Sequence, residues 1–371
     1  MYFKVVNMYA WEGVAGQPAK KLGYVDWNYL ATADVKQADD AIEYIKQHAK
    51  DDKPFFMDVN FMKMHNPNNP APKFAGKTHL GRYSDSMMEL DDNMGRIMDT
   101  IRAEAPDTIV ITTADNGAWQ DAYPDAGTHP FRGEKGTPFE AGWRVPGIMW
   151  WPNHIPAGAV YHEMMSHIDC WATLASMVGL KPPPHGKWQD NNGKPIYFDS
   201  IDNSAYVLGK AKHSARRSWI YINGEALGAV RADVAGDPGT PEEDLNIAWK
   251  SVFTSKDTWL GPTQNLGGIP ALYCLTMDPF EKVDMVFNGG MGSRLPKTSP
   301  GQWSGQDNGW VLSHTQMALA EFDKSIVDFP NIKRFPGGAS NDMIPNLQNP
   351  NSPLPEMDLK KAVQQTVQMS D

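Results

Sequence analysis

The sequence predicts an α/β domain built on a mainly parallel sheet with flanking helices, followed by a small antiparallel sheet. Helix-like and strand-like segments alternate between about residues 35 and 180, and this alternation is typical of βαβ units. The strand-like segments are short and apolar, such as TIVITT (108–113), as in strands buried on both faces. After about residue 195, short strand-like segments follow one another without helices between them, which predicts antiparallel pairing.

The first part of the chain is expected to contain one helix and one buried strand. Residues 1–33 show no clear period, so irregular structure is expected there. A helix is expected over about 35–50, with Asp34 as its N-cap. The apolar, aromatic run PFFMDVNF (54–61) predicts a buried strand, and a loop rich in Asn and Pro follows it.

A long amphipathic helix is expected over about 84–104. Its apolar residues recur at steps of three and four: Met87, Leu90, Met94, Ile97, Met98 and Ile101. Its carboxylates are Asp85, Glu89, Asp91, Asp92 and Asp99. Since apolar residues at this spacing share one face of a helix, that face is expected to be buried and the carboxylates to lie on the solvated face.

The remaining elements are two strands, two helices and the small sheet. Strands are expected at 108–113 and VPGIMWW (145–151), and a helix over 167–178 is expected to end at Gly179. The small sheet is expected from WIYI (219–222), GAVRAD (228–233), AWKSVFTS (248–255) and ALYCLT (271–276). A helix near 311–327 and a Pro/Asn-rich tail that ends in a short helical segment complete the chain.

Composition excludes several classes of function. Lys+Arg is 34 and Asp+Glu is 44, a net charge of −10, which argues against nucleic acid as a partner. Two cysteines exclude a disulfide scaffold and a four-cysteine metal site. No apolar run of about 18 residues predicts a transmembrane helix, and the first residues do not form a signal peptide, so no membrane partner is expected. The compartment stays open between periplasm and cytoplasm.

Polar residues at the ends of the predicted strands are the candidate site residues, because ligands of α/β sheets bind at the carboxyl ends of strands. Asp115 and Asn116 follow the strand at 108–113 and offer adjacent hard oxygens that suit Ca²⁺ or Mg²⁺. The alternative is an Asx turn, since Asp-Asn-Gly is also a strong turn signal. His65 follows the run at 54–61 and suits an anionic oxygen or a proton donor, or it caps loop backbone. Lys135 lies between glycines and suits a sulfate or phosphate oxygen, or it is a solvated loop lysine.

Six segments carry recognisable motifs in a fixed order. They are residues 54–67, LGRYSDSMMELDDNMGRI (80–97), TIVITTADNG (108–117), FRGEKGTPFEAGWRVP (131–146), SHIDCWATLASMVG (166–179) and ALYCLTMDPFEKVDM (271–285). Together they resemble the sulfatase family, which includes the arylsulfatases, of the alkaline phosphatase superfamily. The resemblance implies an alkaline-phosphatase-like fold and a hydrolase of sulfuric esters, with a sulfated small molecule or saccharide as substrate.

The resemblance also implies roles for individual residues. Asp115 and Asn116 correspond to ligands of the family's Ca²⁺ ion. Lys135 corresponds to the lysine that binds the sulfate, and His65 to the histidine that binds sulfate or assists the leaving group. Because the whole chain is acidic, attraction of a sulfate must be local, and the further substrate-binding candidates are Lys63, Arg132 and Arg144.

The sequence departs from the family pattern at the nucleophile. The family makes formylglycine from Cys or Ser in C/S-x-P-x-R, and no such motif occurs in these 371 residues. The family's first metal strand, which ends in Asp-Asp, is also missing. We therefore expect an N-terminally incomplete fold that lacks the nucleophile-bearing segment and binds Ca²⁺ weakly or not at all, because Ca²⁺ takes six to eight oxygens. An uncovered sheet edge would admit an N-terminal partner chain or a second copy of the chain.

Three alternatives for function stay open at this point. The chain is an arylsulfatase-like hydrolase, inactive alone. Or it is a phospho- or carboxyl-ester hydrolase with a substitute hydroxyl nucleophile, for which the candidates are Thr112, Thr113, Ser84 and Thr128. Or it is a non-catalytic pseudoenzyme that binds an anionic ligand. The expected domains are a partial α/β domain over 1–190, a small sheet subdomain over 191–300, and a helix with a tail over 301–371.

Overall fold

The structure is a computed structural model of the chain. It describes residues 8–182, 188–189, 193–223, 226–236, 239–240, 244–266, 270–285 and 310–329. The chain divides into two compact units. The first unit comprises Met1–Thr112, Ala118–Thr128 and Ile148–Pro152, and the second comprises Thr113–Gly117, His129–Gly147 and Asn153–Asp371. The predicted three-part division into 1–190, 191–300 and 301–371 stays a prediction.

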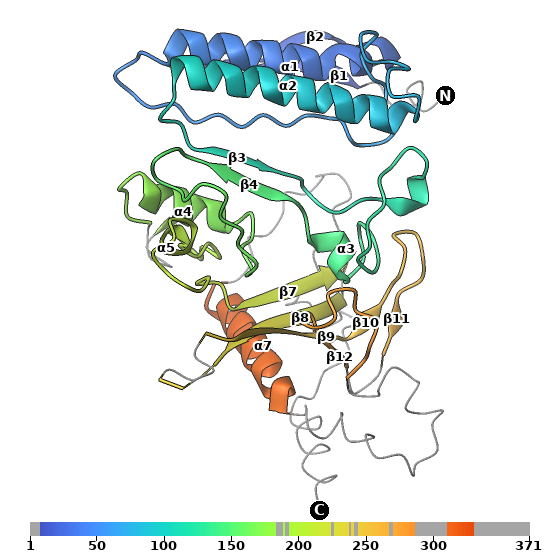
Figure 1. Cartoon of the computed structure of the whole chain (residues 1–371), viewed down its shortest axis with the longest axis vertical. Helices are drawn as coiled ribbons and strands as arrows, with labels where there is room; N and C mark the ends of the chain where they lie inside the picture. The colour runs from blue at the N-terminus through green and yellow to red at the C-terminus, as the bar shows by residue number, and fades with distance from the viewer. Residues whose placement is uncertain are drawn as a thin grey trace, which may run out of the picture. The chain divides into compact units, whose positions relative to one another are not determined.

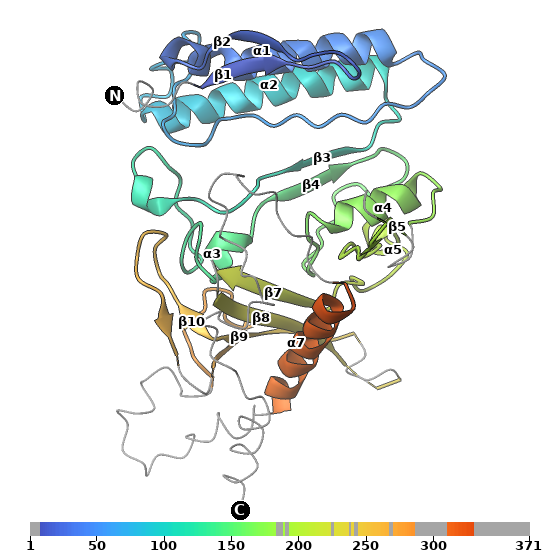
Figure 2. The same cartoon turned by 180° about the vertical axis from the view of Figure 1, so that it is seen from behind.

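The first unit begins with a hairpin and two long helices (Figure 2). Strands β1 (Tyr9–Glu12) and β2 (Lys20–Tyr24) pair antiparallel, so the prediction of irregular structure over 1–33 was wrong. The hairpin is held by contacts across the strands, since the rings of Tyr9 and Tyr24 lie 4.3 Å apart and the Lys21 ammonium lies 3.0 Å from the Tyr9 ring. These strands are too short and too polar to show a clear alternation in the sequence.

Helix α1 (Trp27–His48) begins eight residues earlier than the prediction. Its N-cap is Asp26, whose carboxylate accepts the Tyr29 N–H at 2.8 Å, so the prediction that Asp34 is the cap was wrong. Asp34 lies inside the helix and is buried. Its two oxygens accept the backbone N–H groups of Met62 and Lys63 at 3.0 and 2.9 Å. It therefore fastens the loop after residue 61 to α1.

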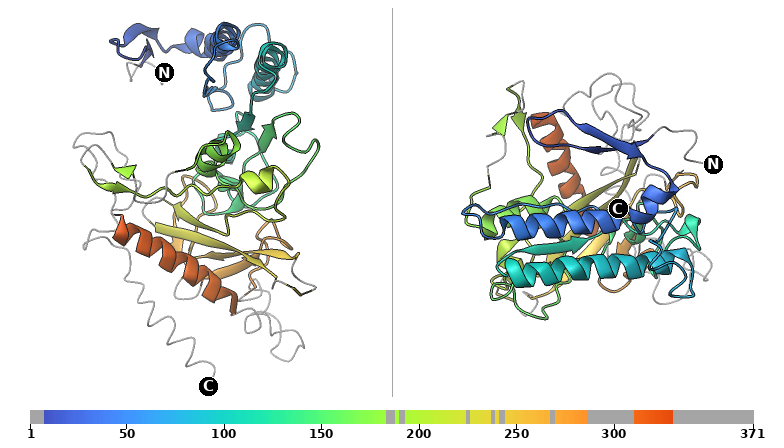
Figure 3. Two further views of the ribbon diagram at one scale, coloured as in Figure 1. Left: turned by 90° about the vertical axis from the view of Figure 1, so that its left-hand side faces the viewer. Right: turned by 90° about the horizontal axis from the view of Figure 1, so that it is seen from above.

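Helix α2 (Arg82–Glu104) confirms the predicted helix, and it runs beside α1 in each view (Figure 3). The predicted burial holds at Ile101, which is buried, and at Asp91 and Asp99, which are exposed, but it was wrong at other positions. Asp85, Glu89 and Asn93 are buried, whereas Met87 and Met88 are exposed. The buried carboxylates accept hydrogen bonds from backbone N–H groups of the loop between the two helices. Asp85 accepts from Gly76 and Thr78, and Glu89 accepts from Ala71.

The run at 54–61 is not in a strand, so that prediction was wrong. Phe56, in its middle, is 83% exposed. A strand is stable only when a neighbouring strand satisfies its backbone groups, and none of the sheets among the described residues includes this segment. The apolar composition of residues 54–61 therefore predicted a buried strand, but no strand of the described residues pairs with this segment.

The strands predicted at 108–113 and 145–151 are confirmed. They are β3 (Val110–Thr113) and β4 (Gly147–Trp150), which pair with each other in a two-stranded sheet (Figure 1). Short helices lie around them in sequence: the 3-10 turn Gln120–Ala122, α3 (Glu140–Trp143), α4 (Asp169–Met177) and α5 (Ser204–Val207). Gly179 follows α4 with a φ of 79°, the backbone conformation expected of a glycine at a helix end.

The second unit is built around a four-stranded antiparallel sheet, which confirms the predicted small sheet. Its order is β12 (Ala271–Cys274), β9 (Asn246–Val252), β8 (Ala226–Ala235) and β7 (Ser218–Asn223). The predicted helix near 311–327 is α7 (Trp310–Asp328), which packs on β7, β8 and β9 (Figure 1). Two further pairs are β5 (Trp188–Gln189) with β6 (Pro195–Ile196) and β10 (Thr254–Ser255) with β11 (Gln264–Asn265).

Three apolar clusters lie in this second unit. One cluster joins Phe139 to the sheet residues Tyr221 and Val252, a second surrounds Leu272, and a third places Val230 against Leu319 of α7. The predicted tail after residue 330 lies outside the described residues. Mixed helices and strands followed by a small antiparallel sheet confirm the predicted fold class. None of the helices in the described ranges is long and apolar enough to cross a membrane.

Candidate functional site

The loop after β3 carries the first pair of candidate residues. Asp115 is exposed, and one of its oxygens accepts the backbone N–H of Asn116 at 2.9 Å. The side-chain nitrogen of Asn116 donates to the carbonyl of Gly117 at 2.9 Å. The Asp115 side chain thus bonds the backbone of the next residue, not the second residue on that an Asx turn requires, and whether the loop binds a cation stays a prediction.

Gly117 fixes this loop to α3. A Cβ at Gly117 would lie 1.6 Å from the carbonyl oxygen of Ala141, so only glycine allows the two backbones to approach this closely. The Gly117 N–H donates to the carbonyl of Gly142 at 3.1 Å. The two consecutive motif segments 108–117 and 131–146 are therefore in direct backbone contact.

A buried charge cluster holds the first residue of α3. The Glu140 carboxylate accepts from the Lys250 ammonium and from the Tyr221 hydroxyl, both at 3.0 Å. Burial alone would raise the pKa of Glu140, but Lys250 and then Arg231 outweigh burial and leave the pKa below its usual value. Burial and the Glu140 charge hold the pKa of Tyr221 well above its usual value.

Glu281 is the second carboxylate of this cluster. Its Oε1 lies 2.9 Å from the Lys250 nitrogen without the angles of a hydrogen bond, so this contact is an ion pair. Its Oε2 accepts the backbone N–H of Glu140 at 2.7 Å. Burial raises the pKa of Glu281; Lys250 opposes this rise and Glu140 adds to it. One ammonium therefore faces two carboxylates, and Glu281 is the one that holds a proton more readily.

Lys135 lies in a tight loop next to Trp259, a residue of the loop between β10 and β11. Gly133 and Gly136 flank it, both with φ of 76°, a conformation that favours glycine. The Lys135 ammonium lies 5.0 Å from the ring of Trp259, within the range of a cation–π contact. The neighbouring Glu134 is buried and accepts the Trp259 backbone N–H at 2.5 Å. The loop between β10 and β11 thus helps to set where Lys135 lies.

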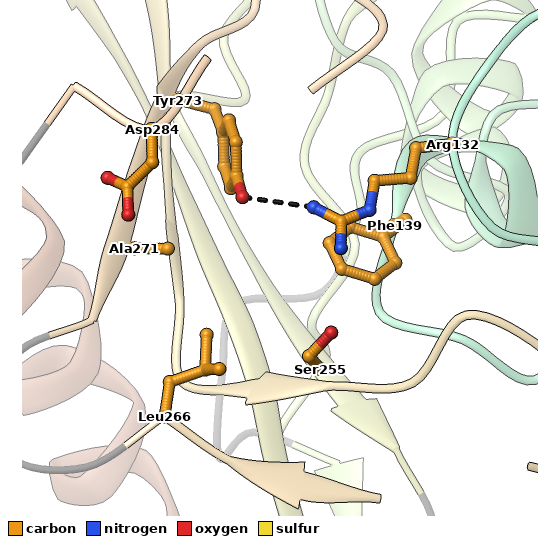
Figure 4. A pocket seen from close by; sticks show the side chains of 7 residues that line it. All are labelled: Arg132, Phe139, Ser255, Leu266, Ala271, Tyr273 and Asp284. Atoms are coloured by element: carbon orange, nitrogen blue, oxygen red, sulfur yellow. Dashed lines mark hydrogen bonds between the residues drawn. The ribbon is translucent and has the colours of Figure 1, made fainter. Parts of the chain in front are cut away.

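Arg132 is engaged inside the second unit. Its guanidinium donates to Asp257 at 3.1 and 3.2 Å and to the Tyr273 hydroxyl at 3.0 Å, and it lies 3.8 Å from the Phe139 ring. Figure 4 shows it pointing toward Tyr273 across a pocket of about 210 Å³. The pocket is lined by Arg132, Phe139, Ser255, Leu266, Ala271, Tyr273 and Asp284. These contacts make Arg132 a tether between the 131–146 segment and the sheet.

Three further candidate residues, Arg144, Lys63 and His65, lie in different surroundings. Arg144 is exposed, with its guanidinium 4.6 Å from the Phe131 ring. Lys63 is buried, and its ammonium lies 2.6 Å from Glu89, so its charge is neutralised within the first unit. His65 is exposed two residues later, with Nδ1 2.6 Å from the Asn66 carbonyl oxygen.

The candidates therefore fall into two groups. Asp115, Asn116, Arg132, Lys135 and Arg144 all belong to the second unit, where backbone contacts join the loops that carry them. Lys63 and His65 belong to the first unit. The second group shares a loop that Asp34 and Glu89 fasten to α1 and α2.

Sequence reasoning missed two arrangements. One is the cluster around Lys250, whose sequence sign is a lysine inside a short strand-like segment. The other joins Thr113, a candidate hydroxyl, to His167: the Thr113 Oγ1 lies 3.0 Å from the His167 Nε2 and 2.9 Å from the Pro146 carbonyl oxygen. His167 stands in the motif segment 166–179, which offered a sign that this histidine lies near the site.

The oxygens of Asp115 and Asn116 are of the kind that binds a hard cation, but they are too few to complete its coordination shell. A carboxylate and an amide oxygen are ligands that Ca²⁺ prefers. Ca²⁺ takes about six to eight oxygens, and the described residues contain no group of three or more His, Cys, Asp or Glu that could hold a metal ion. Among the described residues, Asp115 and Asn116 would therefore provide only part of the oxygens that such an ion needs.

Comparison with known proteins gives a consistent result. The Sulfatase family model matches residues 8–180. N-acetylgalactosamine-6-sulfatase of Mus musculus is 39% identical over 295 residues, which cover 78% of this chain and 52% of that protein. The same enzyme of Sus scrofa is 40% identical over 148 residues, which cover 39% of this chain and 28% of that protein.

The fold agrees with that of a solved sulfatase. The crystal structure of the PsFucS1 sulfatase from Pseudoalteromonas sp. superposes with a TM-score of 0.69 at 24% identity, covering 87% of this chain and 59% of that one. The chain spans about half the length of the mouse relative and less of the pig relative. The matched segments, the order of their motifs and the shared fold lead to one conclusion: this chain belongs to the sulfatase family.

Proposed function

We propose that this protein serves the hydrolysis of sulfuric esters of the arylsulfatase type. The observation that carries the proposal is the backbone contact of the Asp115–Gly117 loop with α3, because it joins a pair of hard oxygen ligands to the segment that carries Lys135. Family membership supports the reaction class. The names of the relatives support a sulfated saccharide as the substrate class.

In this proposal each residue stabilises negative charge on the sulfate group. Asp115 and Asn116 hold part of a Ca²⁺ site, and the bound ion would supply a positive charge at the sulfate oxygens. Lys135 binds a sulfate oxygen as a point charge, and the ring of Trp259 limits how far its ammonium moves. His65 gives a proton to the oxygen that leaves as the S–O bond breaks. Arg144, which is exposed, adds local positive charge.

Lys63 and Arg132 serve this site indirectly. Lys63 pairs with Glu89 and so holds the loop that presents His65. Arg132 pairs with Asp257 and Tyr273 and so holds the loop that presents Lys135. The attack on sulfur is assigned to none of the 371 residues, because none stands in C/S-x-P-x-R.

Turnover of 4-nitrophenyl sulfate tests the assignment. We expect the chain by itself to show no turnover above background, since it offers no formylglycine precursor in its motif. Saturable turnover that survives Lys135→Ala would contradict the assigned site. Calorimetric titration with Ca²⁺ tests the metal assignment, and we expect weak binding that Asp115→Ala abolishes; binding unchanged in Asp115→Ala would refute it.

A second candidate function rests on the pair of Thr113 and His167. A hydroxyl that donates to an imidazole nitrogen is activated as a nucleophile in ester hydrolases. The Thr113 hydroxyl lies 3.0 Å from the His167 Nε2, and its proton would have to turn to this nitrogen from the Pro146 carbonyl. Under this alternative the protein hydrolyses carboxyl or phosphate esters. Turnover of 4-nitrophenyl acetate or phosphate that is lost in both Thr113→Val and His167→Gln would support it, and the absence of turnover with either ester excludes it.

A further inference from the structure

Lys250 is a charged residue in the middle of a buried sheet. It lies in β9, and its side chain is fully buried. Its ammonium contacts Glu140 at 3.0 Å and Glu281 at 2.9 Å, and it lies 4.1 Å from the ring of Tyr221. We call these four residues the Lys250 cluster. Burying an ammonium is costly unless partners surround it, so the cluster holds each of its members in place.

The Lys250 cluster holds α3 through both side chain and backbone. Glu140, the first residue of α3, accepts from Lys250 and from the Tyr221 hydroxyl, and its N–H donates to Glu281. α3 has four residues, too few to be stable as an isolated helix. Its position therefore depends on these contacts with the sheet.

Glu281 shows that the surroundings fix this cluster tightly. Its φ is 53°, in the left-handed region that residues with a side chain rarely adopt. Such a conformation persists where neighbouring contacts enforce it. Here the contacts are those with the Glu140 backbone and the Lys250 ammonium.

α3 in turn holds the loop of Asp115 and Asn116. The Gly117 N–H donates to Gly142 at 3.1 Å, and Ala141 packs where a side chain at Gly117 would lie. An unbroken series of direct contacts therefore leads from Lys250 through Glu140 and α3 to Gly117. Each step is a hydrogen bond, an ion pair or a backbone contact within the second unit.

We propose that Lys250 is a positioning residue, which fixes α3 through Glu140 and thereby sets the geometry of the Asp115–Asn116 loop. The functional meaning rests on the proposed role of that loop as a metal-binding part of the sulfatase site. The small C-terminal sheet is then a component of the site rather than a separate support, because its central strand determines where the loop oxygens lie.

Amide hydrogen exchange at Gly117 tests this inference. We expect Lys250→Met to speed exchange at Gly117 by about tenfold, because the loop loses the element on which it packs. The matched control is Val230→Ala, a fully buried position on the other face of the same sheet, against α7. Truncation of the Val230 side chain destabilises the sheet but removes no contact of the Lys250 cluster. Exchange at Gly117 should therefore change less than twofold in this variant.

A milder variant covers the case in which Lys250→Met does not fold. Tyr221→Phe removes only the hydroxyl that donates to Glu140, and we expect a rise of about threefold at Gly117. Unchanged exchange at Gly117 in these variants, or an equal rise in Val230→Ala, would overturn the proposal. The measurement needs neither metal nor substrate. It can therefore succeed when the loop binds no calcium, and its failure is distinct from a failure of the proposed function.

Discussion

The two units use buried charge in different surroundings. In the first unit the buried residues of α2 are Asp85, Ser86, Glu89, Asn93 and Ile101, and the partners of the two carboxylates are loop backbone groups and Lys63. In the second unit the Lys250 cluster lies beside apolar clusters that join the sheet to Phe139, the residue before α3, and to α7. The comparison shows that polar contacts fix loops in both units, and that in the second unit these contacts lie next to the apolar clusters of the sheet.

The largest expected effect is in the first unit. Glu89→Ala leaves the Lys63 ammonium buried without its partner and the Ala71 N–H without its acceptor. We expect a loss of about 4 kcal/mol in the free energy of unfolding, measured by denaturant titration. Asp92→Ala on the same helix is the control, since its pair with Lys73 is largely exposed and contributes about 0–1 kcal/mol. Equal losses in the two variants would mean that the Lys63–Glu89 pair is not essential.

The apolar core of the second unit predicts the next effect. Leu272 is fully buried in the cluster with Trp249 and Val311. We expect Leu272→Ala to lower the free energy of unfolding by about 3 kcal/mol, through lost burial and the cavity that remains. Leu260→Ala, at a position that is 78% exposed, should change it by less than about 0.5 kcal/mol. A small effect at Leu272 would contradict the contrast between the units.

Two glycines distinguish a tight contact from an open helix surface. Gly117→Ala would place a methyl group against the Ala141 carbonyl, and we expect a loss of about 2 kcal/mol and a displaced Asp115 loop. Gly95→Ala in α2 meets nothing within 4 Å and should stabilise by about 1 kcal/mol, because alanine favours the helix. Thermal denaturation measures both, and a tolerated Gly117→Ala would show that the loop does not depend on α3.

The smallest expected effect is a pH dependence from Glu281. Because burial raises its pKa, the folded state holds this proton more tightly than the unfolded state. This contribution to stability is complete below the unfolded pKa of about 4.3 and is lost as the pH rises through the raised pKa. Glu140 has the opposite sign, since its lowered pKa stabilises the fold above about 4.3. In a profile of melting temperature against pH, Glu281→Gln should remove the fall in stability that occurs as the pH rises through the pKa of Glu281. A profile parallel to that of the unchanged protein would contradict this expectation.

The sequence predicted the parts of the fold that depend on local periodicity. The strands at Val110 and Gly147, the small sheet and the helices at Arg82 and Trp310 were confirmed, because their apolar patterns repeat along the chain. Asp85 and Glu89 of α2 were predicted to be solvated and are buried, because they accept backbone N–H groups of a loop, which a pattern of side chains does not show. The run at 54–61 was predicted as a strand because apolar composition does not reveal whether a partner strand exists.

The sequence predicted the residues of the candidate site, but not the ion pairs and hydrogen bonds that hold these residues in place. Motif order identified Asp115, Asn116 and Lys135, and whether these bind metal and sulfate stays a prediction. Sequence spacing could not show that Lys250, 110 residues after Glu140, holds the turn on which the loop packs. Nor could it show that Arg132 and Lys63, predicted as substrate cations, pair with Asp257 and Glu89. Long-range ion pairs leave no periodic pattern in a single sequence.

The most direct test of the central claim is the binding of a sulfated monosaccharide in the presence of Ca²⁺. Calorimetry would compare the protein with Lys135→Ala and with the control Lys282→Ala, which removes an exposed lysine that also contacts an aromatic ring, that of Phe280. The account predicts binding of the sulfated sugar, but not of its unsulfated form, which Lys135→Ala abolishes and Lys282→Ala leaves unchanged. Binding that persists in Lys135→Ala, or that does not distinguish the two sugars, would contradict the sulfate site.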